Sequence, residues 1–539
     1  MAADHRSVML LAASAIFIIV ALMPVTFLLL DSFTSDQGLN LATYHSILSN
    51  KRQTQLLKNT IKLSVAVTIL STLMGVPLSI LLYKTDLPLQ KIYRIAFISI
   101  LIVPPYIGAI AWINLMGSAG YLNQAISGIT GLKSPLFDIY GFWGSVLVLT
   151  LSTFPLVVLL SGGALNSIDK NLEEAAIISR GYLKSITAVT LRLASPGITL
   201  GALLVFITVV SDFGVVSFLT YDTFTIEIYS QLAAFYDTKT ATAYSLVLIA
   251  LALPPILLHT RIYGTKTYTS IFSATTSKTL KLGKWRKPAL VATTLLLTIS
   301  LILPLSTLAY TSLFFYGKFS HIQNYLTSLN QGMSNITNSL LYSLAGSTAS
   351  MILGFTIAYG LRQKNNTNKK IFDMALTLPY ILPGTIIGLG LIILWNNPTL
   401  LIYNTPIIII IGYMAKYTFI ASKTSEIALN KISRSLEEAA ELTGSMWHKT
   451  LRKITLPLSS PTLSNGWILT YILCMTELNT TIMVYPPGQA TLPISLYILQ
   501  HDGPPGLVAA LAVTLILITL APIVSLTTIR WLKTRKSSS

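Results

Sequence analysis

Leu436-Glu437-Glu438-Ala439-Ala440-Glu441-Leu442-Thr443-Gly444 is a short charged stretch that lies between two long apolar runs. Glutamate and alanine are strong helix formers, so the stretch predicts a short helix. Gly444 can end that helix and turn the chain. The stretch continues to Ile454-Thr455-Leu456-Pro457, where Pro457 suits the first turn of another helix because its missing N–H has no helical partner there. The sequence therefore predicts a helix, a turn and a second helix between two apolar segments.

A second copy of this pattern lies earlier in the chain. Glu173-Glu174-Ala175-Ala176 is followed by Gly181, and residues 190–196 (Thr-Leu-Arg-Leu-Ala-Ser-Pro) parallel residues 455–461 (Thr-Leu-Pro-Leu-Ser-Ser-Pro). The first copy is degenerate, because its glycine comes one residue later and Arg192 replaces the first proline of the later segment. Two copies in one chain predict two fused units.

The composition is that of a membrane protein. Hydrophobic residues make up 53% of the 539 residues and charged residues only 10%, which is typical of polytopic membrane proteins. The net charge of +18 does not indicate nucleic-acid binding, because the basic residues fall between apolar runs. The single cysteine, Cys474, excludes a disulfide within the chain. The apolar run after Arg6 is too long for the core of a signal peptide, so we expect a retained first span.

Twelve apolar runs are long enough to cross a membrane, at about 20 residues each. We therefore expect an all-α polytopic membrane protein with twelve transmembrane helices in two tandem six-helix repeats. The first half is expected at 1–260, with its degenerate loop at 173–196, and the second half at 288–539, with its loop at 437–461. A basic cytoplasmic linker is expected at 261–287. The predicted spans lie near 8–30, 61–83, 95–115, 141–161, 193–219, 241–260, 288–312, 337–361, 371–395, 405–422, 458–485 and 506–529.

The distribution of positive charge predicts the orientation, since cytoplasmic loops are enriched in Lys and Arg. With the N-terminus inside, most of the 37 Lys and Arg residues fall in inner segments. This places both Glu-Ala-Ala segments and both termini in the cytoplasm. The chain itself is expected in the plasma or inner membrane of the cell. The basic linker is expected to be solvated beside the lipid, without a binding function.

The two halves match at further positions. Asn59-Thr60 before the second span parallels Asn338-Ser339 before the eighth, and Val103-Pro104-Pro105 in the third span parallels Leu382-Pro383-Gly384 in the ninth, at the same separation. A parallel repeat of this kind relates the halves by an axis along the membrane normal. Proline within a span interrupts helical hydrogen bonding. The sequence leaves open whether these prolines make packing kinks or bends that line a translocation pathway.

Two acidic residues, Asp212 and Glu477, lie within spans at equivalent places of the two halves. A carboxylate in a span is costly unless it faces the bundle interior, water or a partner, so we expect both to line the pathway between the halves. The alternatives are that each caps an irregular stretch, beside Gly214 or Asn479, or that one of them is neutral. Two such acids would suit a cationic substrate and repel phosphate-like anions.

The spacing of residues 438–457, with Glu438-Ala439-Ala440, then Gly444, then Ile454-x-Leu456-Pro457, resembles the EAA loop of ABC importer permeases of the MetI-like (type I) family. In that family the loop forms a short cytoplasmic coupling helix that docks into a groove on the ATPase subunit. The resemblance implies that Glu174 and Glu438 contact the ATPase, and it leaves open whether the degenerate first loop docks like the second. The implied coupling residues are Glu173, Glu174, Ala175, Ala176, Gly181, Glu437, Glu438, Ala439, Ala440, Gly444 and Pro457.

The sequence around the two acids looks like that of the fused permeases of ferric-iron importers. The similar segments are 211–216 (Ser-Asp-Phe-Gly-Val-Val), 221–229, 475–478 (Met-Thr-Glu-Leu) and 490–494, although Asn479 stands where the family pattern has proline. Fused thiamine permeases share this architecture. Thiamine or another small solute is therefore the alternative to ferric iron.

The sequence has neither a Gly-x-x-x-x-Gly-Lys-Ser/Thr phosphate loop nor a His and Cys cluster with metal-ligand spacing. We therefore expect no metal site, no cofactor and no enzymatic activity in this chain, with ATP and Mg on two separate ATPase subunits. The resemblance also implies an extracytoplasmic substrate-binding protein that docks on 220–240 and 486–505, and ATP-driven alternating access. The expected environment is membrane lipid, without nucleic acid. An ion-driven secondary transporter is the rival class, since it would also have repeats and buried acids, but it would not need EAA loops.

Overall fold

The fold was analysed in a computed structural model of the chain. The structure describes residues 5–35, 38–39, 44, 47, 49–131, 134–263, 280–315, 318–319, 322–362, 366–396, 402–443 and 445–537. Most of the expected linker at 261–287 therefore lies outside the described residues. The all-α fold class predicted from the sequence is confirmed, because the only strands among the described residues are two-residue pairs.

The first series of elements covers the N-terminal half of the chain. Two of its short segments are π-helical, η1 (Ile18–Leu22) and η3 (Ile186–Thr190), and η2 (Ile100–Ile102) is a 3-10 turn. The helices and strands are α1 (His5–Phe17), α2 (Met23–Phe33), β1 (Thr34–Ser35), β2 (Gly38–Leu39), α4 (Lys51–Lys84), α5 (Gln90–Ser99), α6 (Pro105–Met116), α7 (Tyr121–Thr130), α8 (Phe142–Asn166), α9 (Lys170–Arg180), α10 (Tyr182–Ser185), α11 (Leu191–Val210), α12 (Gly214–Phe218), α13 (Phe224–Ala233) and α14 (Thr238–Tyr263).

The second series follows the same order in the C-terminal half. Its short segments are η4 (Gly283–Trp285) and the π-helical η5 (Thr298–Ile302) and η6 (Leu451–Thr455). The helices and strands are α16 (Arg286–Leu297), α17 (Leu303–Ser312), β3 (Phe314–Phe315), β4 (Lys318–Phe319), α18 (Gln323–Leu361), α19 (Asn366–Ile381), α20 (Gly384–Trp395), α21 (Ile407–Asn430), α22 (Arg434–Leu442), α23 (Trp447–Thr450), α24 (Leu456–Met475), α25 (Thr481–Val484), α26 (Leu492–Asp502) and α27 (Pro505–Ser537). Among the described residues, α7 is the one helix of the first series that has no counterpart in the second series.

Nine helices in the described part of the chain are long and apolar enough to cross a membrane, and two bent helix pairs raise this number to eleven. The bends are 94° between Gln90–Ile102 and Pro105–Thr130 and 100° between Lys369–Ile381 and Gly384–Trp395. They fall at the prolines singled out in the sequence, Pro104 and Pro383, which precede α6 and α20. The predicted span at 458–485 corresponds to α24, whose first half is rich in serine and which fails the same test of length and composition.

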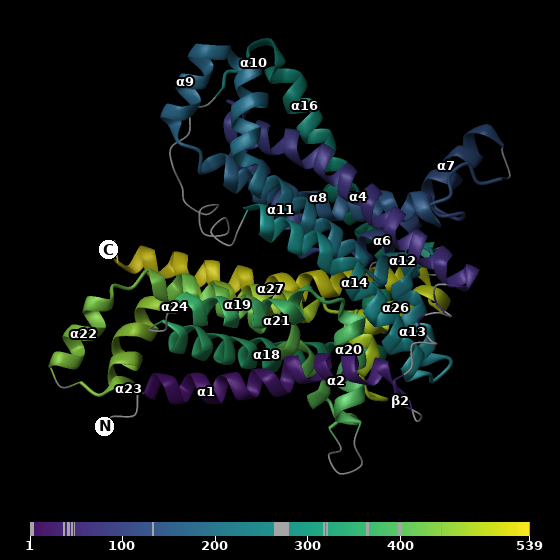
Figure 1. Ribbon diagram of the computed structural model, residues 1–539. Coiled ribbons are helices and arrows are strands. Elements are labelled where there is room, and N and C mark those ends of the chain that lie inside the picture. Colours follow the sequence, from purple (N-terminus) through teal and green to yellow (C-terminus); the bar gives the residue numbers. More distant parts are fainter. Residues whose placement is uncertain are drawn as a thin grey trace.

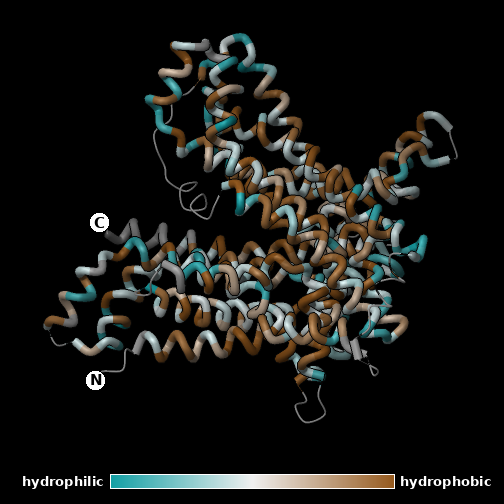
Figure 2. The backbone as a smooth tube through the Cα atoms, viewed as in Figure 1, coloured by the Kyte–Doolittle hydropathy of each residue, from teal (hydrophilic) through white to brown (hydrophobic). Residues whose placement is uncertain are grey.

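The helices form two arms that meet at one end and diverge toward the other (Figure 1). One arm contains α4, α8 and α11, which pack on one another, and the other contains α18, α21 and α24. Brown, apolar residues run along both arms, and hydrophilic residues gather at the ends (Figure 2). A shared apolar core crosses the junction, with buried residues from both halves of the sequence, such as Phe213 and Leu478.

The first span of each series packs on the opposite arm. In the N-terminal series, α1 lies along α18, η1 contacts α21 and α2 packs on α20 (Figure 1). In the C-terminal series, α16 contacts α5 and α17 packs on α6, and the Tyr93 hydroxyl lies 2.7 Å from Thr294 Oγ1. The arms are therefore built from both halves of the sequence.

The matching Asn-Thr and Asn-Ser pairs have matching contacts. In the first series, Asn59 Nδ2 donates to the carbonyl of Asp222 at 3.0 Å, and Thr60 Oγ1 accepts from the N–H of Phe224 at 3.0 Å. Phe224 is the first residue of α13. Thr60, in the first third of α4, thus satisfies a free N–H at the start of α13.

The second series repeats the arrangement on α18. Asn338 Nδ2 donates to the carbonyl of Ala490 at 3.2 Å, and Ser339 Oγ accepts from the N–H of Leu492, the first residue of α26, at 2.6 Å. Each long helix is therefore tied to a short helix at the end of the molecule where the arms meet.

Candidate functional site: coupling helices and central helix breaks

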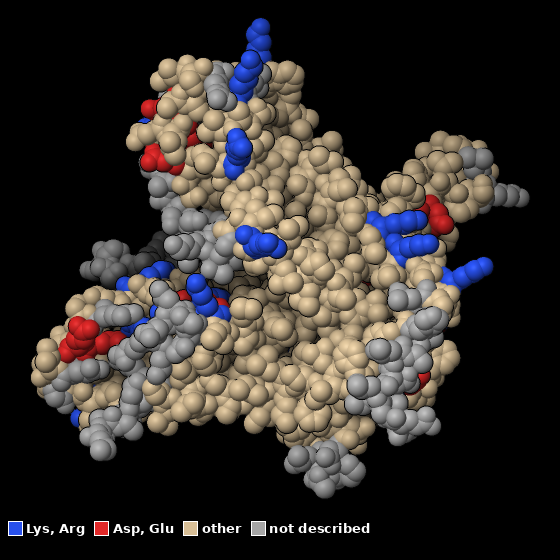
Figure 3. All heavy atoms as spheres, viewed as in Figure 1, with Lys and Arg blue, Asp and Glu red and all other residues tan. Residues whose placement is uncertain are grey.

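The two Glu-Ala-Ala segments form helices at the separated ends of the arms. Figure 1 shows α9 at the end of one arm and α22 at the end of the other, on the same side of the molecule as both chain termini. Acidic side chains gather at these two tips, and the surface between the ends of the molecule is almost free of charge (Figure 3). Both segments thus lie where a single partner assembly can reach them together.

Short-range interactions set the limits of α9. Asp169 caps the start of the helix by accepting the N–H of Asn171 at 2.8 Å, which satisfies one of the free N–H groups of its first turn. Gly181 follows the last residue of the helix with φ +74°, a backbone conformation that side chains other than glycine rarely adopt. The chain then turns into α10 and η3 before entering α11.

The second copy has the same order of elements. The N–H of Thr443 donates to the carbonyl of Ala439 at the end of α22, and Gly444 lies outside the described residues. Pro457 occupies the first turn of α24, where its missing N–H costs little. Arg192 lies in the first turn of α11 in the first copy.

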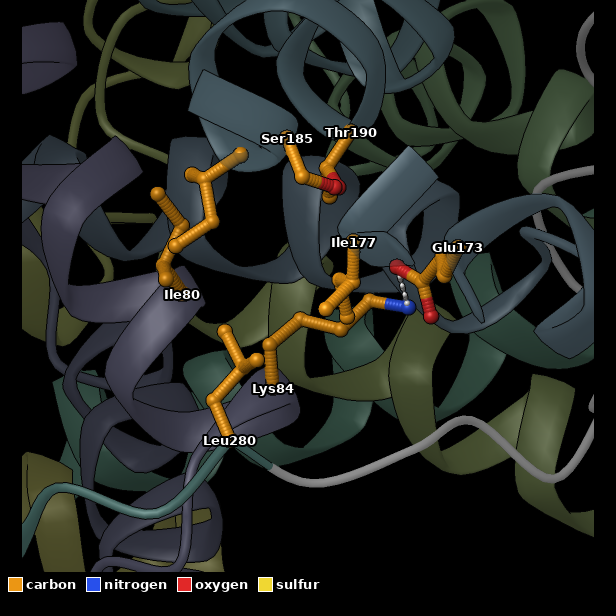
Figure 4. Close-up of a pocket in the computed structure, with 8 residues that line it drawn as sticks. Ile80, Lys84, Glu173, Ile177, Ser185, Thr190 and Leu280 are labelled. Carbon is orange, nitrogen blue, oxygen red and sulfur yellow. Dashed lines mark ion pairs between the residues drawn. The ribbon is translucent and has the colours of Figure 1, made fainter. Parts of the chain in front are cut away.

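The first glutamate of each copy is buried in an ion pair. Lys84 Nζ lies 2.6 Å from Glu173 Oε1, and the two side chains are 3% and 6% exposed (Figure 4). A small cavity next to this pair is lined by Ile177, Ser185 and Thr190 among others. Lys84 is the last residue of α4, so the pair joins the helix of the motif to the long helix of its arm.

The second copy contains an equivalent pair with more hydrogen bonds. Arg362 Nη1 donates to Glu437 Oε1 at 2.5 Å, and Thr455 Oγ1 donates to the same oxygen at 2.9 Å. Arg362 Nη2 also donates to the carbonyl of Ile432. Arg362 directly follows α18. Sequence reasoning missed both basic partners, although each is a Lys or Arg at the inner end of a predicted span.

The second glutamate of each copy points elsewhere. Glu438 is exposed and Glu174 is half-buried. Of the alanines, Ala175 and Ala439 are exposed, Ala176 is buried and Ala440 is half-buried. Successive helical residues are about 100° apart around the axis, so adjacent glutamates face different sides of one helix.

Large apolar side chains are exposed at equivalent positions of the two helices. Leu172 is 55% exposed and Leu436 48%, while Ile178 is 86% exposed and Leu442 89%. Apolar side chains clustered on an exposed helix are characteristic of binding surfaces. The two helices thus present the same type of surface at the two arm tips.

The acidic residue Asp212 lies where α11 ends. Its Oδ1 accepts the N–H groups of Val215 at 2.9 Å and Val216 at 3.3 Å, so it caps the start of α12. This is the capping geometry that the sequence left open as the alternative to a pathway-lining role. The pathway role of Asp212 remains a prediction.

Glu477 occupies the equivalent place after α24 and has a cationic partner. Its Oε1 accepts the N–H of Thr480 at 2.8 Å and lies 2.9 Å from Lys416 Nζ, and the Tyr417 hydroxyl donates to Oε2. Sequence reasoning considered only acids within spans and overlooked Lys416, which is the single charged residue of the predicted span at 405–422. A lysine in such a run was the available signal.

The breaks of the two halves touch each other at the junction of the arms. Asn479 Nδ2 donates to the carbonyl of Ser211 at 3.3 Å, and the Tyr106 hydroxyl donates to the carbonyl of Thr476 at 3.4 Å. Proline at position 479, which the resemblance led us to expect, has no side-chain amide that could donate this hydrogen bond. Asn479 therefore supplies a contact between the halves.

The bend before α20 packs directly on this junction. A Cβ atom on Gly384 would lie 2.8 Å from Asn479 Cβ and 2.9 Å from Lys416 Nζ. Only glycine leaves room for this approach. Pro383 thus lies next to the central contact, and Pro104 precedes the helix that carries Tyr106. Their pathway role remains a prediction. No cluster of three or more His, Cys, Asp or Glu suitable for a metal ion occurs among the described residues.

Comparison with known proteins places the chain among transport permeases. The model of the binding-protein-dependent transport system inner membrane component family matches residues 346–529, which include α22 and the Glu477 break. An Fe(3+)-transport system permease protein of Haemophilus influenzae is 26% identical over 492 residues, covering 88% of this chain and 90% of that protein. A ferric transport system permease protein of Actinobacillus pleuropneumoniae is 25% identical over 490 residues, covering 87% and 70%.

A shorter relative is more similar in sequence. A Salmonella choleraesuis protein that carries the name of a 2-aminoethylphosphonate transport system permease is 31% identical over 196 residues, covering 36% of this chain and 74% of that protein. The predicted resemblance to MetI-like permeases is thereby confirmed. This chain belongs to the family of binding-protein-dependent transport system inner membrane components, the permeases of ABC importers.

Proposed function

We propose that the chain is the permease of an ATP-driven importer in which two ATPase subunits bind α9 and α22. The main support for this proposal is that the two helices share the same pattern. In each helix, one glutamate is buried against the arm, and apolar side chains at equivalent positions are exposed. An exposed Leu or Ile at nearly 90% is unfavourable in water. A partner surface that covers Ile178 and Leu442 removes this cost.

The proposed topology has twelve spans in two six-helix repeats, with both termini and both coupling helices in the cytoplasm. The basic segments around α9, α22 and the start of α16 support this orientation. The eleven candidate spans and the matching order of elements support the repeat. The binding protein then docks at the opposite face, where α13 and α26 lie, which agrees with the expected docking segments at 220–240 and 486–505.

Transport proceeds by alternating access. The arms diverge on the side of the coupling helices (Figure 1), so this arrangement corresponds to a state open to the cytoplasm. ATP draws the two ATPase subunits together and with them α9 and α22. The arms close on that side and the contacts between the helix breaks, such as Asn479 to Ser211, open on the other. Substrate enters from the binding protein and leaves inward after hydrolysis.

Ferric iron is the proposed substrate. The support is that two relatives named for ferric transport match more than four-fifths of the chain and that the similar segments include both helix breaks. The carboxyl group of Asp212 lies at the junction, accepts two backbone N–H groups and has no ion pair with a Lys or Arg among the described residues, so its oxygens are where a cationic substrate would approach. Thiamine is the alternative, and its test is the same.

The experiment is transport by the purified chain in liposomes, together with its ATPase and its binding protein. Uptake of radiolabelled ferric ion should require ATP inside and the loaded binding protein outside, and a 100-fold excess of thiamine should not compete. Competition by thiamine would indicate that thiamine, and not ferric iron, is the substrate. Uptake that persists without ATP and collapses with an uncoupler would instead favour an ion-driven secondary transporter.

A further inference from the structure

We propose that Glu173 and Glu437 are positioning residues that connect each coupling helix to the long helix of its arm, so that movement of the ATPase subunits reaches the opposite face of the membrane. This inference rests on the proposed function, because it assigns a task within ATP-driven coupling. It separates the two neighbouring glutamates of each motif. The first is bound to the arm in both motifs, and in the second motif its neighbour Glu438 is exposed.

The first step of the connection is the buried ion pair. Lys84 ends α4 and Arg362 directly follows α18, and each is paired with the first glutamate of its coupling helix. The side chains of all four residues are 6% exposed or less. An ion pair in such surroundings is costly to separate, since separation leaves a buried charge without compensation. The coupling helix therefore cannot shift without moving the end of the long helix.

The second step is the long helix itself. α4 contains 34 residues and α18 contains 39, so at 1.5 Å per residue each is about 50 to 60 Å long and exceeds the thickness of a bilayer. A continuous helix of this length transmits a displacement or tilt from one end to the other. Neither helix contains a 3-10 or π segment, but α4 contains Pro77 seven residues before Lys84, so α18 is the more regular of the two helices.

The third step is the attachment of each long helix to a short helix, roughly 25 residues or about 37 Å before the basic residue of its ion pair. Near the start of α4, Arg52 Nη2 lies 2.9 Å from Glu227 Oε2 of α13, and Asn59 and Thr60 hold the start of the same helix. On α18, Asn338 and Ser339 hold the start of α26. Each long helix thus joins a coupling helix at one face to a short helix at the face proposed for the binding protein.

The two connections differ in strength. Glu437 receives hydrogen bonds from both Arg362 and Thr455, whereas Glu173 Oε2 has no hydrogen-bond partner among the described residues. Replacing Glu437 therefore removes more contacts than replacing Glu173. The C-terminal half should carry the stronger coupling.

The test uses the full complex of this chain with its ATPase and binding protein in lipid nanodiscs. Three quantities are measured: the ATPase that co-purifies, the basal ATP hydrolysis, and the stimulation of hydrolysis by loaded binding protein. Glu437→Gln should keep the ATPase bound and lower the stimulation by roughly tenfold, within the range of coupling energies between distant sites. Glu173→Gln should lower it less. The exposed neighbour provides the control, since Glu438→Gln should reduce co-purification of the ATPase.

A charge exchange separates coupling from simple loss of folding. Arg362→Glu alone should abolish stimulation, and the double variant Arg362→Glu with Glu437→Arg should recover it to within a few-fold of wild type. The inference is overturned if Glu437→Gln is stimulated like wild type, or if the double variant assembles normally with its ATPase yet shows no recovery. If the wild-type chain fails to retain any ATPase, the proposed function itself fails, and this outcome is distinct from both.

Discussion

At the scale of single residues, Asp212 and Glu477 occupy equivalent positions but have different neighbours. Asp212 is hydrogen-bonded to two backbone N–H groups, and Glu477 is paired with Lys416 and hydrogen-bonded to Tyr417. The position equivalent to Lys416 in α8 is occupied by an uncharged residue, since no Lys or Arg occurs within that helix. Among the described residues, the two helix breaks therefore bring together two carboxyl groups and one ammonium group, and the ammonium group belongs to the second half.

Removal of Lys416 should be strongly destabilising. The side chains of Lys416 and Glu477 are 13% and 7% exposed, so Lys416→Met leaves a buried carboxylate without its cation, at a cost of about 3 to 5 kcal/mol. The double variant Lys416→Met with Glu477→Gln should recover most of this loss. Thermal unfolding of the purified chain in detergent measures both, and equal melting temperatures of the single and double variants would contradict the assignment.

Substitution of Asp212 distinguishes a capping role from a pathway role. Asp212→Asn keeps an oxygen that accepts from Val215 and Val216, so its stability should stay close to that of wild type. Asp212→Ala removes the cap and should cost about 1 kcal/mol. Iron uptake by the Asn variant is the second measurement. A stable Asn variant with reduced uptake would show that the negative charge itself is needed, whereas unchanged uptake would leave Asp212 with capping alone.

Sequence reasoning identified the residues of the motifs but only part of their contacts. It selected Glu174 and Glu438 as ATPase contacts, and the structure places Glu438 on the exposed side, which leaves this prediction untested. It did not find that Glu173 and Glu437 face inward, because their partners Lys84 and Arg362 lie about 75 to 90 residues away. Pattern and spacing along one helix do not reveal which neighbouring element supplies a counter-charge.

At the scale of elements, α22 is a short helix between the long α21 and the four-residue α23. The helix presents Leu436 and Leu442 outward and Glu437 inward, and an isolated helix of nine residues is marginal in water. Its packing on α23 and η6 and its pair with Arg362 therefore hold it in place. The coupling helix is an attached element whose position depends on the arm.

Deletion of Glu438-Ala439-Ala440 should uncouple the transporter. The deletion removes Glu438, moves Leu442 about 4.5 Å along the axis toward Glu437 and turns it by a net angle of about 60°, so the outward surface no longer matches the partner. We expect loss of binding-protein-stimulated ATP hydrolysis while the protein still accumulates in the membrane. A deletion of three residues from α7, which has no counterpart in the other series, is the control and should leave stimulation near wild type. Uptake that survives the first deletion would refute the docking assignment.

The sequence predicted where the long apolar helices lie, because apolar runs mark them well, but several boundaries were wrong: α4 begins at 51 and not at 61, and α18 begins at 323 and not at 337. Pro104 and Pro383 correctly marked places where the chain breaks, but not the sharpness of the bends, 94° and 100°. At the second bend, Gly384 packs closely against Lys416 and Asn479. The break after α24 made the predicted span at 458–485 shorter than expected, with α25 as a separate short helix. Break geometry is a tertiary property, and single-sequence patterns do not encode its angle.

At the scale of the whole molecule, the two arms should approach each other during the transport cycle. Cysteines introduced at Lys184 and His448, which are exposed at equivalent positions just after the two coupling helices, can carry spin labels once the buried native Cys474 is replaced by alanine. In the assembled importer, an ATP analogue that traps the closed ATPase should shorten the distance between the labels, because both helices follow the same pair of subunits. An unchanged distance distribution would contradict alternating access by arm closure.

The arrangement of the first spans was beyond the reach of the sequence. The apolar run at 8–30 predicted a helix, and the structure contains α1 and α2 there. Nothing in that run indicates that it packs on α18, α20 and α21, since an apolar surface fits lipid and protein equally well. The choice between neighbours is made by the shape of the assembled arms.

Because the first span of each half packs on the other arm, the order of synthesis affects how the protein assembles. The ribosome makes α1 roughly 300 residues before α18, a delay of about 15 to 60 s at usual elongation rates. During that interval α1 must lie in lipid without its eventual neighbour. Its many exposed aliphatic side chains, such as Leu11 and Ile16, are compatible with lipid contact. Because both halves are joined in one polypeptide, α1 stays covalently linked to α18, on which it later packs. Each newly made chain therefore contains both packing partners.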